Sequence, residues 1–538
     1  MSANGAGDGA WTVLVTDNVS ESGLASLRSD ARFEIVKIDD SSDPAFAEAL
    51  PRAHGLIVRS ATKVRAELLE QATSLRVIGR AGVGVDNIDL AASTERGIAV
   101  MNAPDGNTVS AAELTMALIL SMVRRVAEAD SSVRGGEWAR SRFKGAELRG
   151  RTLGLVGAGR IGGEVARRCR AFGMSVVVFD PYLTAERATE LRAEPLELEQ
   201  LLERADVLSL HVPLTDATRG MIGADALARM KKGSFLVNVA RGGVVDEAAL
   251  SDALGSGQLA GAALDVYVNE PLEEDSPLRS APNLVLTPHL GASTAEAQEL
   301  VASEISETVR TALADGDLSH ALNAPAVGGD TMQLLRPLFE LGESLGRLAC
   351  ALTPGAVREI EIRYAGDAHE GLDPLVSFVL VGLLRDVVGR DKVNFVSAPH
   401  LARQRDIGVA RTRLSRDADY GEYVEVVLHS ERGDLRLAGA LLGDAHPRIV
   451  RVADYRVDVV PTGTLLVLMN EDVPGVIGRV GTLLGEHGIN IAGYHQARLS
   501  KGGEALAAIA VDGEVGSDVR DAILGLAEVS KAVVVQLT

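Results

Sequence analysis

The chain has 538 residues, of which 46% are hydrophobic and 24% charged, so it is too long for one core and predicts three or four globular domains. Its net charge of −20 argues against a nucleic-acid or membrane partner, and its two cysteines are too few for a disulfide framework or a cysteine metal site. The first ten residues lack the parts of a signal peptide, and no apolar run could span a bilayer. We therefore expect a cytoplasmic protein without a bound metal.

The first hundred residues predict a parallel α/β lobe. Strands are expected at 11–16, 33–37, 55–59, 75–79 and 100–102, with helical patterns such as 21–29 and 44–50 between them. A loop rich in helix breakers at 103–107 precedes one long helical pattern over 110–129. The pattern alone fits a linker or dimer-contact helix and a plain core helix equally well.

A glycine-rich turn follows this helix. Residues 153–156 predict a buried strand, and Gly157-x-Gly159-x-x-Gly162 leads into a helix. In such a turn the first glycine permits a tight bend, the second a close approach to a pyrophosphate, and the third close packing of helix on strand. The next predicted strand, 175–179, ends at Asp180, which is placed to bond the ribose hydroxyls of an adenosine. Because no arginine follows to receive a 2′-phosphate, the pattern favours NAD over NADP.

The rest of this unit predicts a doubly wound sheet inserted into the first lobe. Further strands are expected at 206–211, 234–240, 261–265 and 284–286, and a helix at 295–314 could carry the chain back. We therefore assign 10–106 and 291–326 to one lobe and 107–290 to an NAD-binding domain. A mixed α/β segment, 327–460, follows, in which no residue indicates a particular chemistry.

The last segment, 461–538, predicts a ferredoxin-like unit. Strands at 464–469, 489–499, 505–511 and 531–537 alternate with helices at 476–487 and 517–526, which is the order βαββαβ.

Three polar residues follow strands of the NAD-binding unit. Arg241 follows strand 234–240, Glu270 lies shortly after strand 261–265, and His289 follows strand 284–286. Ligands of open α/β sheets bind at the carboxyl ends of the strands, so all three can face one cleft. A guanidinium suits a carboxylate, and a histidine oriented by a carboxylate can take or return the proton of a hydroxyl. The set predicts oxidation of a hydroxy acid.

The chain resembles the D-isomer-specific 2-hydroxyacid dehydrogenases. The resemblance lies in the glycine turn, in Val-Ala-Arg-Gly-Gly at 239–243, in 265–271 and in Thr-Pro-His-Leu-Gly-Ala at 287–292. Stretches 58–62, 79–89 and 102–108 support it. The resemblance implies two Rossmann-like doubly wound lobes, with the NAD domain inserted into the substrate lobe. A mixed α/β intervening domain and an ACT domain, a module that binds amino acids between paired copies, would follow.

By this resemblance, Arg241 would hold the substrate carboxylate, and His289, paired with Glu270, would act as general acid and base. Arg160 and Ile161 would meet the pyrophosphate through backbone N–H groups. Further cofactor contacts are implied for Gly157, Gly159, Gly162, Asp180, Val83, Val212, Val239, Ala240, Asp265, His289, Gly291 and Ala292. Substrate contacts are implied for Arg59, Ser60, Arg80, Gly82 and Asn107, with Arg59 and Arg80 as candidates for a phosphate; ordinary solvated arginines are the alternative.

The long members of the family imply oxidation of D-3-phosphoglycerate to 3-phosphohydroxypyruvate by NAD, the first step of phosphorylated L-serine synthesis. In the ACT segment Asp472, Asn490 and Asn470 match positions that bind serine in regulated relatives; a purely structural dimerisation domain is the alternative. A homo-oligomer, a tetramer in our expectation, is also implied. Reduction of another 2-oxo acid such as hydroxypyruvate, and an NAD-sensing corepressor without enzymatic activity, are the alternative functions.

Overall fold

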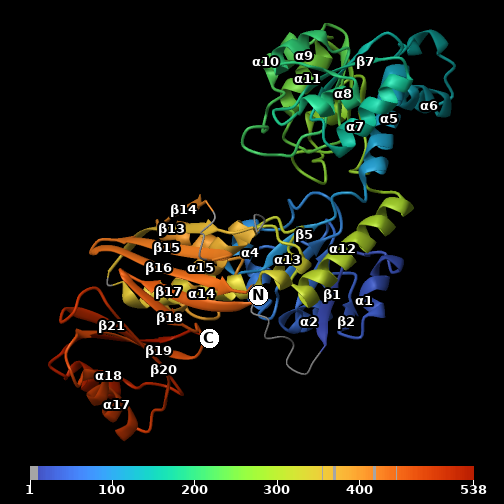
Figure 1. Cartoon of the computed structure of the whole chain (residues 1–538). Coiled ribbons are helices and arrows are strands. Elements are labelled where there is room, and N and C mark those ends of the chain that lie inside the picture. Colours follow the sequence, from blue (N-terminus) through green and yellow to red (C-terminus); the bar gives the residue numbers. More distant parts are fainter. Residues whose placement is uncertain (1–9, 354, 368–370, 416–419, 444, 538) are drawn as a thin grey trace.

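The computed structural model describes residues 10–353, 355–367, 371–415, 420–443 and 445–537. Four sheets follow one another along the chain (Figure 1). The strands of the first two sheets are all parallel, whereas the last two sheets are mainly antiparallel. The expected mixed α/β fold with parallel Rossmann-like sheets is confirmed. Within the described ranges, no helix combines the length and the apolar character that crossing a bilayer requires.

The first sheet forms the core of the substrate lobe and has the order β2-β1-β3-β4-β5. Every residue of β1 and β3 is buried, as expected for a parallel sheet covered on both faces. The elements are β1 (Trp11–Val15), η1 (Ser22–Leu24), α1 (Ala25–Ser29), β2 (Phe33–Lys37), α2 (Pro44–Ala49), η2 (Leu50–Arg52), β3 (Gly55–Val58), α3 (Ala66–Gln71), β4 (Val77–Arg80), α4 (Leu90–Glu95) and β5 (Ala99–Asn102).

Helix α12 (Ala295–Asp315) brings the chain back onto this lobe after the NAD lobe. It packs closely because glycines face it: a Cβ on Gly79 would lie 2.7 Å from Ile305, and one on Gly23 would lie 2.3 Å from the Cβ of Ala302. The NAD lobe is therefore inserted between β5 and α12, as the sequence predicts.

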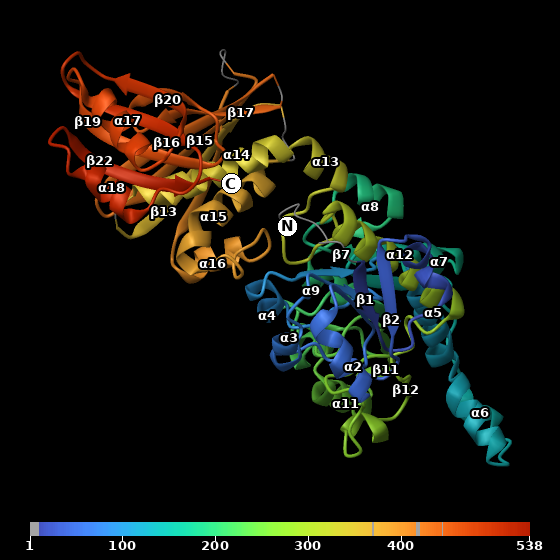
Figure 2. The same ribbon diagram turned by 90° about the horizontal axis from the view of Figure 1, so that it is seen from below.

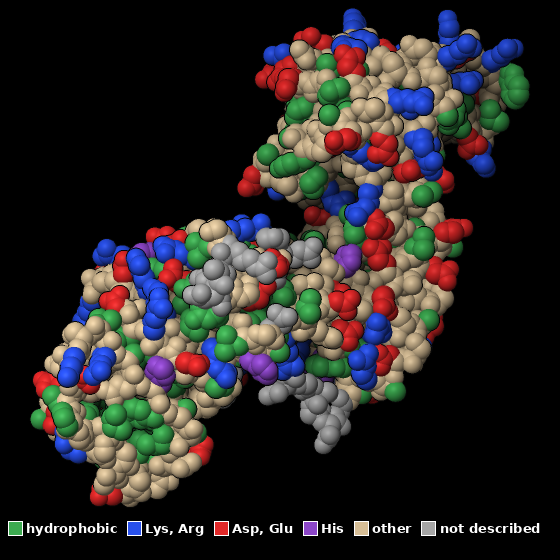
Figure 3. All heavy atoms as spheres, in the orientation of Figure 1, with side chains coloured by type: hydrophobic (Ala, Val, Ile, Leu, Met, Phe, Trp, Pro, Cys, Tyr) green, Lys and Arg blue, Asp and Glu red, His purple; other side chains and the backbone are tan. Residues whose placement is uncertain are grey.

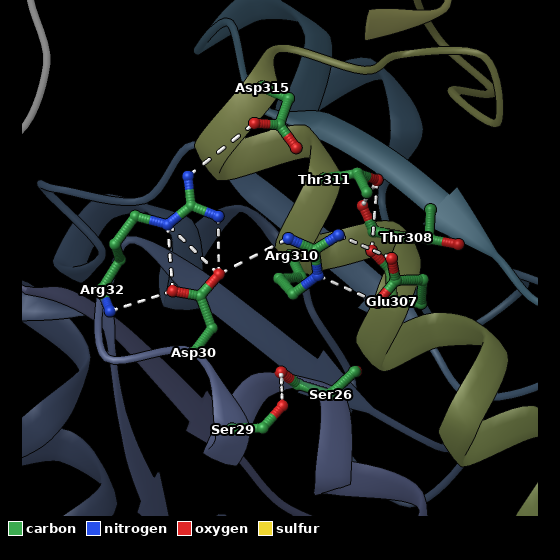
Figure 4. A network of polar contacts seen from close by, with 9 residues as sticks. All are labelled: Ser26, Ser29, Asp30, Arg32, Glu307, Thr308, Arg310, Thr311 and Asp315. Atoms are coloured by element: carbon green, nitrogen blue, oxygen red, sulfur yellow. Dashed lines mark hydrogen bonds and ion pairs between the residues drawn. The ribbon is translucent and has the colours of Figure 1, made fainter.

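A polar network fixes the same helix to the strand β2 side of the lobe (Figure 4). Arg310 on α12 binds Glu307 at 2.7 Å and reaches Asp30 at 3.5 Å, and Arg32 binds Asp30 at 2.6 Å. The hydrogen bonds from Arg32 hold the pKa of Asp30 well below its usual range. The network joins segments about 280 positions apart, as the Asp30–Arg310 contact shows.

The NAD lobe is a seven-stranded parallel sheet in the order β12-β11-β10-β9-β6-β7-β8. The direction in which successive strands are added reverses beside β6, the strand before the glycine turn. Ligands of such sheets bind at this switch point. The elements are α5 (Thr108–Arg124), α6 (Val126–Arg134), η3 (Arg140–Phe143), β6 (Thr152–Val156), α7 (Arg160–Ala171), β7 (Ser175–Phe179), α8 (Ala185–Leu191), β8 (Glu194–Pro195), α9 (Leu198–Arg204), β9 (Val207–Leu210), α10 (Ala224–Arg229), β10 (Ser234–Asn238), α11 (Glu247–Gly255), β11 (Leu259–Leu264), η4 (Pro277–Ser280) and β12 (Leu284–Leu286).

The single helix predicted over 110–129 is wrong. The chain forms two helices, α5 and α6, that meet at Arg125, whose φ of 56° is left-handed. The Arg125 side chain fixes this break by donating to the carbonyl of Arg142 at 2.9 Å and to Asn283 at 3.0 Å. Apolar periodicity continues across such a break, so the pattern could not reveal it. As a result α6 reaches away from both lobes (Figure 2).

The C-terminal half contains two further sheets. The first, in the order β14-β13-β15-β16-β17-β18, packs against α14 and α15, and the second has the ferredoxin-like order β20-β21-β19-β22. The elements are α13 (Gly329–Leu334), α14 (Arg336–Leu352), β13 (Val357–Ala365), α15 (Leu372–Val388), α16 (Ala398–Gln404), β14 (Gly408–Arg413), β15 (Glu422–Ser430), β16 (Gly433–Leu442), β17 (His446–Val452), β18 (Tyr455–Val459), β19 (Thr464–Glu471), α17 (Val476–Glu486), β20 (Ile491–Arg498), β21 (Glu504–Val511), α18 (Ser517–Leu524) and β22 (Val529–Gln536).

Polar contacts connect these units to each other and to the substrate lobe. Buried Arg347 on α14 donates to the carbonyl of Leu537 at 2.9 Å, which holds the end of the last strand. Asn394 donates to the carbonyl of Gly97 at 2.8 Å, and Phe395 is buried in the core of the substrate lobe.

Candidate active site

The glycine turn has the shape that a dinucleotide requires. Gly157 has a φ of 93°, and a Cβ there would lie 2.4 Å from the carbonyl oxygen of His211. A Cβ on Gly162 would lie 2.2 Å from the carbonyl oxygen of Gly157, so the start of α7 packs against the turn itself. A Cβ on Gly159, in contrast, would meet nothing within 4 Å. The space in front of the α7 N-terminus is thus open, as the approach of a pyrophosphate demands.

Asp180 stands at the end of β7 and supports this turn. Its carboxylate accepts from the backbone N–H of Ala158 at 2.8 Å and of Tyr182 at 2.9 Å. Arg160, the first residue of α7, forms a 2.5 Å ion pair with Asp105. Ile161 is partly buried against the core of the lobe. The residues present therefore fit an adenosine diphosphate group at the end of β6.

His289 and Glu270 form a close pair at the open end of the sheet. Nδ1 of His289 lies 2.7 Å from Oε2 of Glu270, and both side chains are exposed. The other oxygen of Glu270 accepts from the backbone N–H of Tyr267 at 3.1 Å. Burial raises the pKa of Glu270, but the hydrogen bond and charge of His289 outweigh it, so this pKa lies below its ordinary value. Since Nδ1 faces Glu270, Nε2 is left for a ligand.

Asp265 holds the loop that carries His289. It is fully buried, and its two oxygens accept from the Thr287 hydroxyl at 2.6 Å and from the backbone N–H groups of Leu290 and Gly291 at 2.7 and 2.9 Å. Burial raises the pKa of Asp265. The loop needs this support because His289 has a left-handed φ of 55°, which is unfavourable for a residue with a Cβ.

Three arginines from the two lobes gather at the cleft. Arg241 follows β10, Arg80 ends β4 and Arg59 follows β3. Burial, together with the positive charges of Arg241 and Arg59, lowers the pKa of Arg80 to about 10. Figure 3 shows Lys and Arg side chains in the hollow between the two lobes. The cleft is thus locally basic on a strongly acidic protein and suits an anionic ligand.

The loop that carries Arg59 is fixed by two residues that sequence reasoning missed. Asp17 accepts from the N–H of Arg59 at 2.8 Å and from the hydroxyl of Thr62 at 2.6 Å. Asn87 donates to the backbone carbonyls of the same two residues, Arg59 and Thr62. Asp17 follows β1 at the same edge of the sheet, so its place after a strand was an available signal. Ser60, which lies on this loop, is exposed and accepts from Lys63 through its carbonyl.

The remaining predicted positions lie around the same cleft. Val212 lies beside the glycine turn, since a Cβ on Gly157 would be 3.0 Å from it. Val239 lies beside Gly291, where a Cβ would be 3.5 Å from it. The carbonyl of Val83 accepts from Asn102 at 2.6 Å, and a Cβ on Gly82 would lie 1.4 Å from the Arg80 guanidinium. Ala240 accepts from Arg241, and Ala292 is partly buried. Oδ1 of Asn107 is buried without a hydrogen-bond partner at the start of α5.

The three predicted effector residues are not brought together. Asp472 binds Arg498 at 2.8 Å, which lowers the pKa of Asp472, and Asn490 donates to Asp512 at 2.7 Å. Asn470 is 1% exposed and donates to the carbonyl of Glu471. Among the described contacts, none joins one of these three residues to another. The described residues also include no cluster of three or more potential metal ligands.

Comparison with known proteins agrees with this geometry. Residues 116–291 match the family described as D-isomer specific 2-hydroxyacid dehydrogenase, NAD binding domain. Residues 334–453 match the D-3-phosphoglycerate dehydrogenase intervening domain, and 463–528 match the ACT domain. These matches confirm the intervening domain and the ACT domain that the resemblance implies for the C-terminal half.

Similar proteins span the whole chain. The D-3-phosphoglycerate dehydrogenase of Archaeoglobus fulgidus is 39% identical over 98% of this chain and 100% of its own length, and that of Bacillus subtilis is 41% identical over 93% and 95%. A D-lactate dehydrogenase structure from Aquifex aeolicus, complexed with NAD and lactic acid, is 31% identical with a TM-score of 0.52, covering 58% of this chain and 100% of that one. The expected enzyme class and the cofactor NAD are confirmed. The chain is an NAD-dependent dehydrogenase and belongs to the D-3-phosphoglycerate dehydrogenase family of D-isomer-specific 2-hydroxyacid dehydrogenases.

Proposed function

We propose that this chain oxidises D-3-phosphoglycerate to 3-phosphohydroxypyruvate with NAD⁺, the first step of phosphorylated L-serine biosynthesis. The observation that carries the proposal is the gathering of Arg59, Arg80 and Arg241 at the cleft that also holds the His289–Glu270 pair. A simple 2-hydroxy acid offers one carboxylate, which a single guanidinium can bind. Two further arginines suit a second anionic group, the phosphate.

The proposed chemistry uses three side chains. Arg241 binds the substrate carboxylate with its planar fork and fixes the position of the hydroxyl-bearing carbon. Nε2 of His289 takes the proton of the hydroxyl as the C–H bond of the same carbon breaks and the carbonyl forms. Glu270 orients the ring through Nδ1 and balances the positive charge that His289 gains. When bound, NAD⁺ supplies the two-electron oxidant for this step.

We also propose contacts for the cofactor and for the substrate. The pyrophosphate would meet the backbone of Arg160 and Ile161, and Asp180 would bond the adenosine ribose. The support is the open space at Gly159 and the position of Asp180 beside the turn. The other cofactor positions in this proposal are Gly157, Gly162, Val83, Val212, Val239, Ala240, Asp265, His289, Gly291 and Ala292. The substrate positions are Arg59, Ser60, Arg80, Gly82 and Asn107.

Consumption of NADH with 3-phosphohydroxypyruvate, measured beside unphosphorylated hydroxypyruvate, tests the substrate. We expect kcat/KM to favour the phosphorylated acid by at least about 100-fold, because its phosphate gains charge-assisted contacts in the cleft. In Arg80→Gln this preference should collapse while the rate with hydroxypyruvate changes little. If the parent protein prefers hydroxypyruvate, its substrate is another 2-oxo acid and not the phosphorylated one. An absence of turnover with any 2-oxo acid, despite NADH binding, would favour a corepressor.

Regulation and assembly are part of the same proposal. L-Serine would bind the ACT domain through Asp472, Asn490 and Asn470, as feedback from the end of the pathway. The active form would be a cytoplasmic homotetramer with the domain ranges 10–106 with 291–326, 107–290, 327–460 and 461–538. The support for assembly is the arm that begins with α6, where Trp138, Val126 and Val133 are exposed, since such apolar patches are typical of interfaces. Light scattering with and without serine tests both parts.

A further inference from the structure

Asp86 lies on the loop that follows β4, in the substrate lobe, and faces a residue of the other lobe. Its Oδ2 is 3.0 Å from Nε of Arg241, which follows β10 in the NAD lobe. This ion pair therefore spans the cleft, and it touches the arginine to which we assign the substrate carboxylate. Asp86 is well exposed, whereas Arg241 is mostly buried. The carboxylate thus reaches Arg241 from the solvent side of the cleft.

Two nitrogens of the Arg241 guanidinium have polar partners, and the third packs against the backbone of the Gly84 loop. Nε faces Asp86, and Nη1 donates to the carbonyl of Ala240 at 2.6 Å. Nη2 lies against Gly84, so closely that a Cβ on Gly84 would be 1.8 Å from it. Because the group is planar, contacts at two nitrogens set the directions of all its remaining N–H bonds. The loop of Gly84 and Asp86 therefore forms a socket that receives an arginine from the other lobe.

Gly84 serves this socket by its lack of a side chain and not by its backbone conformation. Its φ is outside the left-handed region, so an alanine there would not strain the chain. The atoms that a Cβ would meet are Nη2 and Cζ of Arg241 and, at 2.9 Å, Oδ2 of Asp86. These three nearest atoms all belong to the ion pair, so an added methyl group would press on the pair first.

Asp86 also offsets the charge of the arginine cluster. Arg80 lies close to both Arg241 and Arg59, and Asp86 and Asp17 are the carboxylates that act on it. The oxygens of Asp17 are already bonded to the loop of Arg59 and Thr62. Asp86, in contrast, contacts a guanidinium of the cluster directly.

We propose that Asp86 is a positioning residue for the dehydrogenase reaction: with Gly84 it orients Arg241 across the cleft, so that the guanidinium presents its free edge to the substrate carboxylate. The proposal rests on the role assigned to Arg241 under the proposed function. It implies that the substrate-binding arginine is set only when the substrate lobe and the NAD lobe meet. A competing reading, in which Asp86 merely occupies Arg241 until substrate displaces it, predicts the opposite sign of the effect below.

The test compares Asp86→Asn, Asp86→Glu and Gly84→Ala in the full chain, with NADH and 3-phosphohydroxypyruvate. In Asp86→Asn we expect KM for the oxo acid to rise about tenfold with a smaller change in kcat, and the NADH Kd to stay within twofold. Gly84→Ala should raise KM similarly, and Asp86→Glu should recover most of the loss. Asp252→Asn, an exposed carboxylate on α11, serves as the control.

Two outcomes would overturn the proposal. An unchanged KM in Asp86→Asn would show that the pair does not orient Arg241, and a lower KM would show that Asp86 competes with the substrate. Arg241→Ala separates this result from the proposed function. If Arg241→Ala retains full activity, the role of Arg241 itself is wrong. If Arg241→Ala is inactive while Asp86→Asn and Gly84→Ala behave as the parent, only the positioning role fails.

Discussion

The predicted residues of the cleft contact one another, whereas those of the ACT unit do not. In the cleft, residues from separate strand ends lie close together. His289 is 2.7 Å from Glu270, and burial and the charges of Arg241 and Arg59 lower the pKa of Arg80. In the ACT unit, Asp472 is bound to Arg498 and Asn490 to Asp512. A parallel sheet collects the ends of its strands at one edge of one chain. The neighbouring strands of the ACT sheet are antiparallel, so their carboxyl ends alternate between the two edges of the sheet and do not gather these residues.

The largest expected effect concerns the proton acceptor of the cleft. His289→Ala should lower turnover of 3-phosphohydroxypyruvate by about 10³-fold, since general acid–base catalysis contributes on the order of 10²–10⁴. NADH binding should stay within about threefold, because His289 is one of many proposed cofactor contacts and the glycine turn lies at another strand of the sheet. Stopped-flow turnover and fluorescence titration of NADH measure the two quantities.

A second histidine pair provides a matched control. His429 in the intervening domain lies 2.9 Å from Asp434 and is also exposed. His429→Ala should leave turnover unchanged. A His289→Ala enzyme with more than a tenth of the parent activity would remove the proposed general base and, with it, the contrast between cleft and C-terminal half.

The next effect concerns the support beneath the catalytic loop. Asp265→Asn replaces two acceptor oxygens by one, so the N–H of Leu290 or of Gly291 loses its partner. A lost hydrogen bond to a charged group costs about 1.5–3 kcal/mol, and the left-handed His289 depends on this loop. We expect kcat to fall about 10- to 100-fold. Activity within twofold of the parent would mean that Thr287 and the backbone hold the loop without the carboxylate.

The sequence could indicate candidate residues of the cleft because their chemistry restricts residue types. Gly157 and Gly162 have no room for a Cβ, and Arg241, Glu270 and His289 each follow a strand. These are local properties that a pattern can reveal. Strands β2, β7 and β12 were predicted with their observed bounds for the same reason, since short runs rich in apolar and β-branched residues between turns have few alternatives.

Long-range partners could not be predicted in this way. Asp86 and Gly84 act on Arg241 about 155 positions away, and nothing in the sequence around either one indicates the contact. The break of the α5–α6 pattern at Arg125 has the same origin, since Asn283 and Arg142 hold it from other parts of the chain. The two-residue strand β8 was missed because so short a segment has no period.

A smaller effect is expected in the ACT unit. Arg498 occupies Asp472, the carboxylate proposed to receive the ammonium of serine. Arg498→Ala should free Asp472 and lower the serine concentration for half-maximal inhibition by about three- to tenfold. Arg520→Ala, which removes a guanidinium paired with its neighbour Asp521 on α18, is the control and should leave that concentration unchanged. Inhibition assays at fixed substrate provide the measurement.

The result decides between two views of the ACT unit. If Arg498→Ala lowers the serine concentration for half-maximal inhibition, the unit is a serine-binding site whose affinity is reduced by Arg498. If neither the parent nor Arg498→Ala responds to serine, the effector proposal is wrong, and the unit serves structure or assembly alone.

The smallest effect appears in the response of the NAD lobe to pH. His211 follows β9 and contacts Ser209 at 2.8 Å, and its carbonyl lies against Gly157. Burial lowers the pKa of His211 from 6.5 to about 4. Between pH 6.5 and about pH 4, His211 therefore binds a proton in the unfolded chain but stays neutral in the folded lobe. The stabilisation is complete above pH 6.5 and is lost as the pH falls toward 4, by at most about 1.4 kcal/mol per pH unit.

Hydrogen exchange of peptides covering β6 and β9, compared at pH 7 and pH 5, measures this loss within the lobe. The parent should lose protection at pH 5 beyond the intrinsic change in exchange rate, and His211→Gln should lose less, because glutamine takes up no proton. His429→Gln in the C-terminal half should behave as the parent. Equal losses in the parent and in His211→Gln would mean that His211 is not the group that makes the turn sensitive to acid. The acid response of the lobe would then have to come from carboxylates such as Glu270, whose lowered pKa also destabilises the folded state on protonation, but at a lower pH.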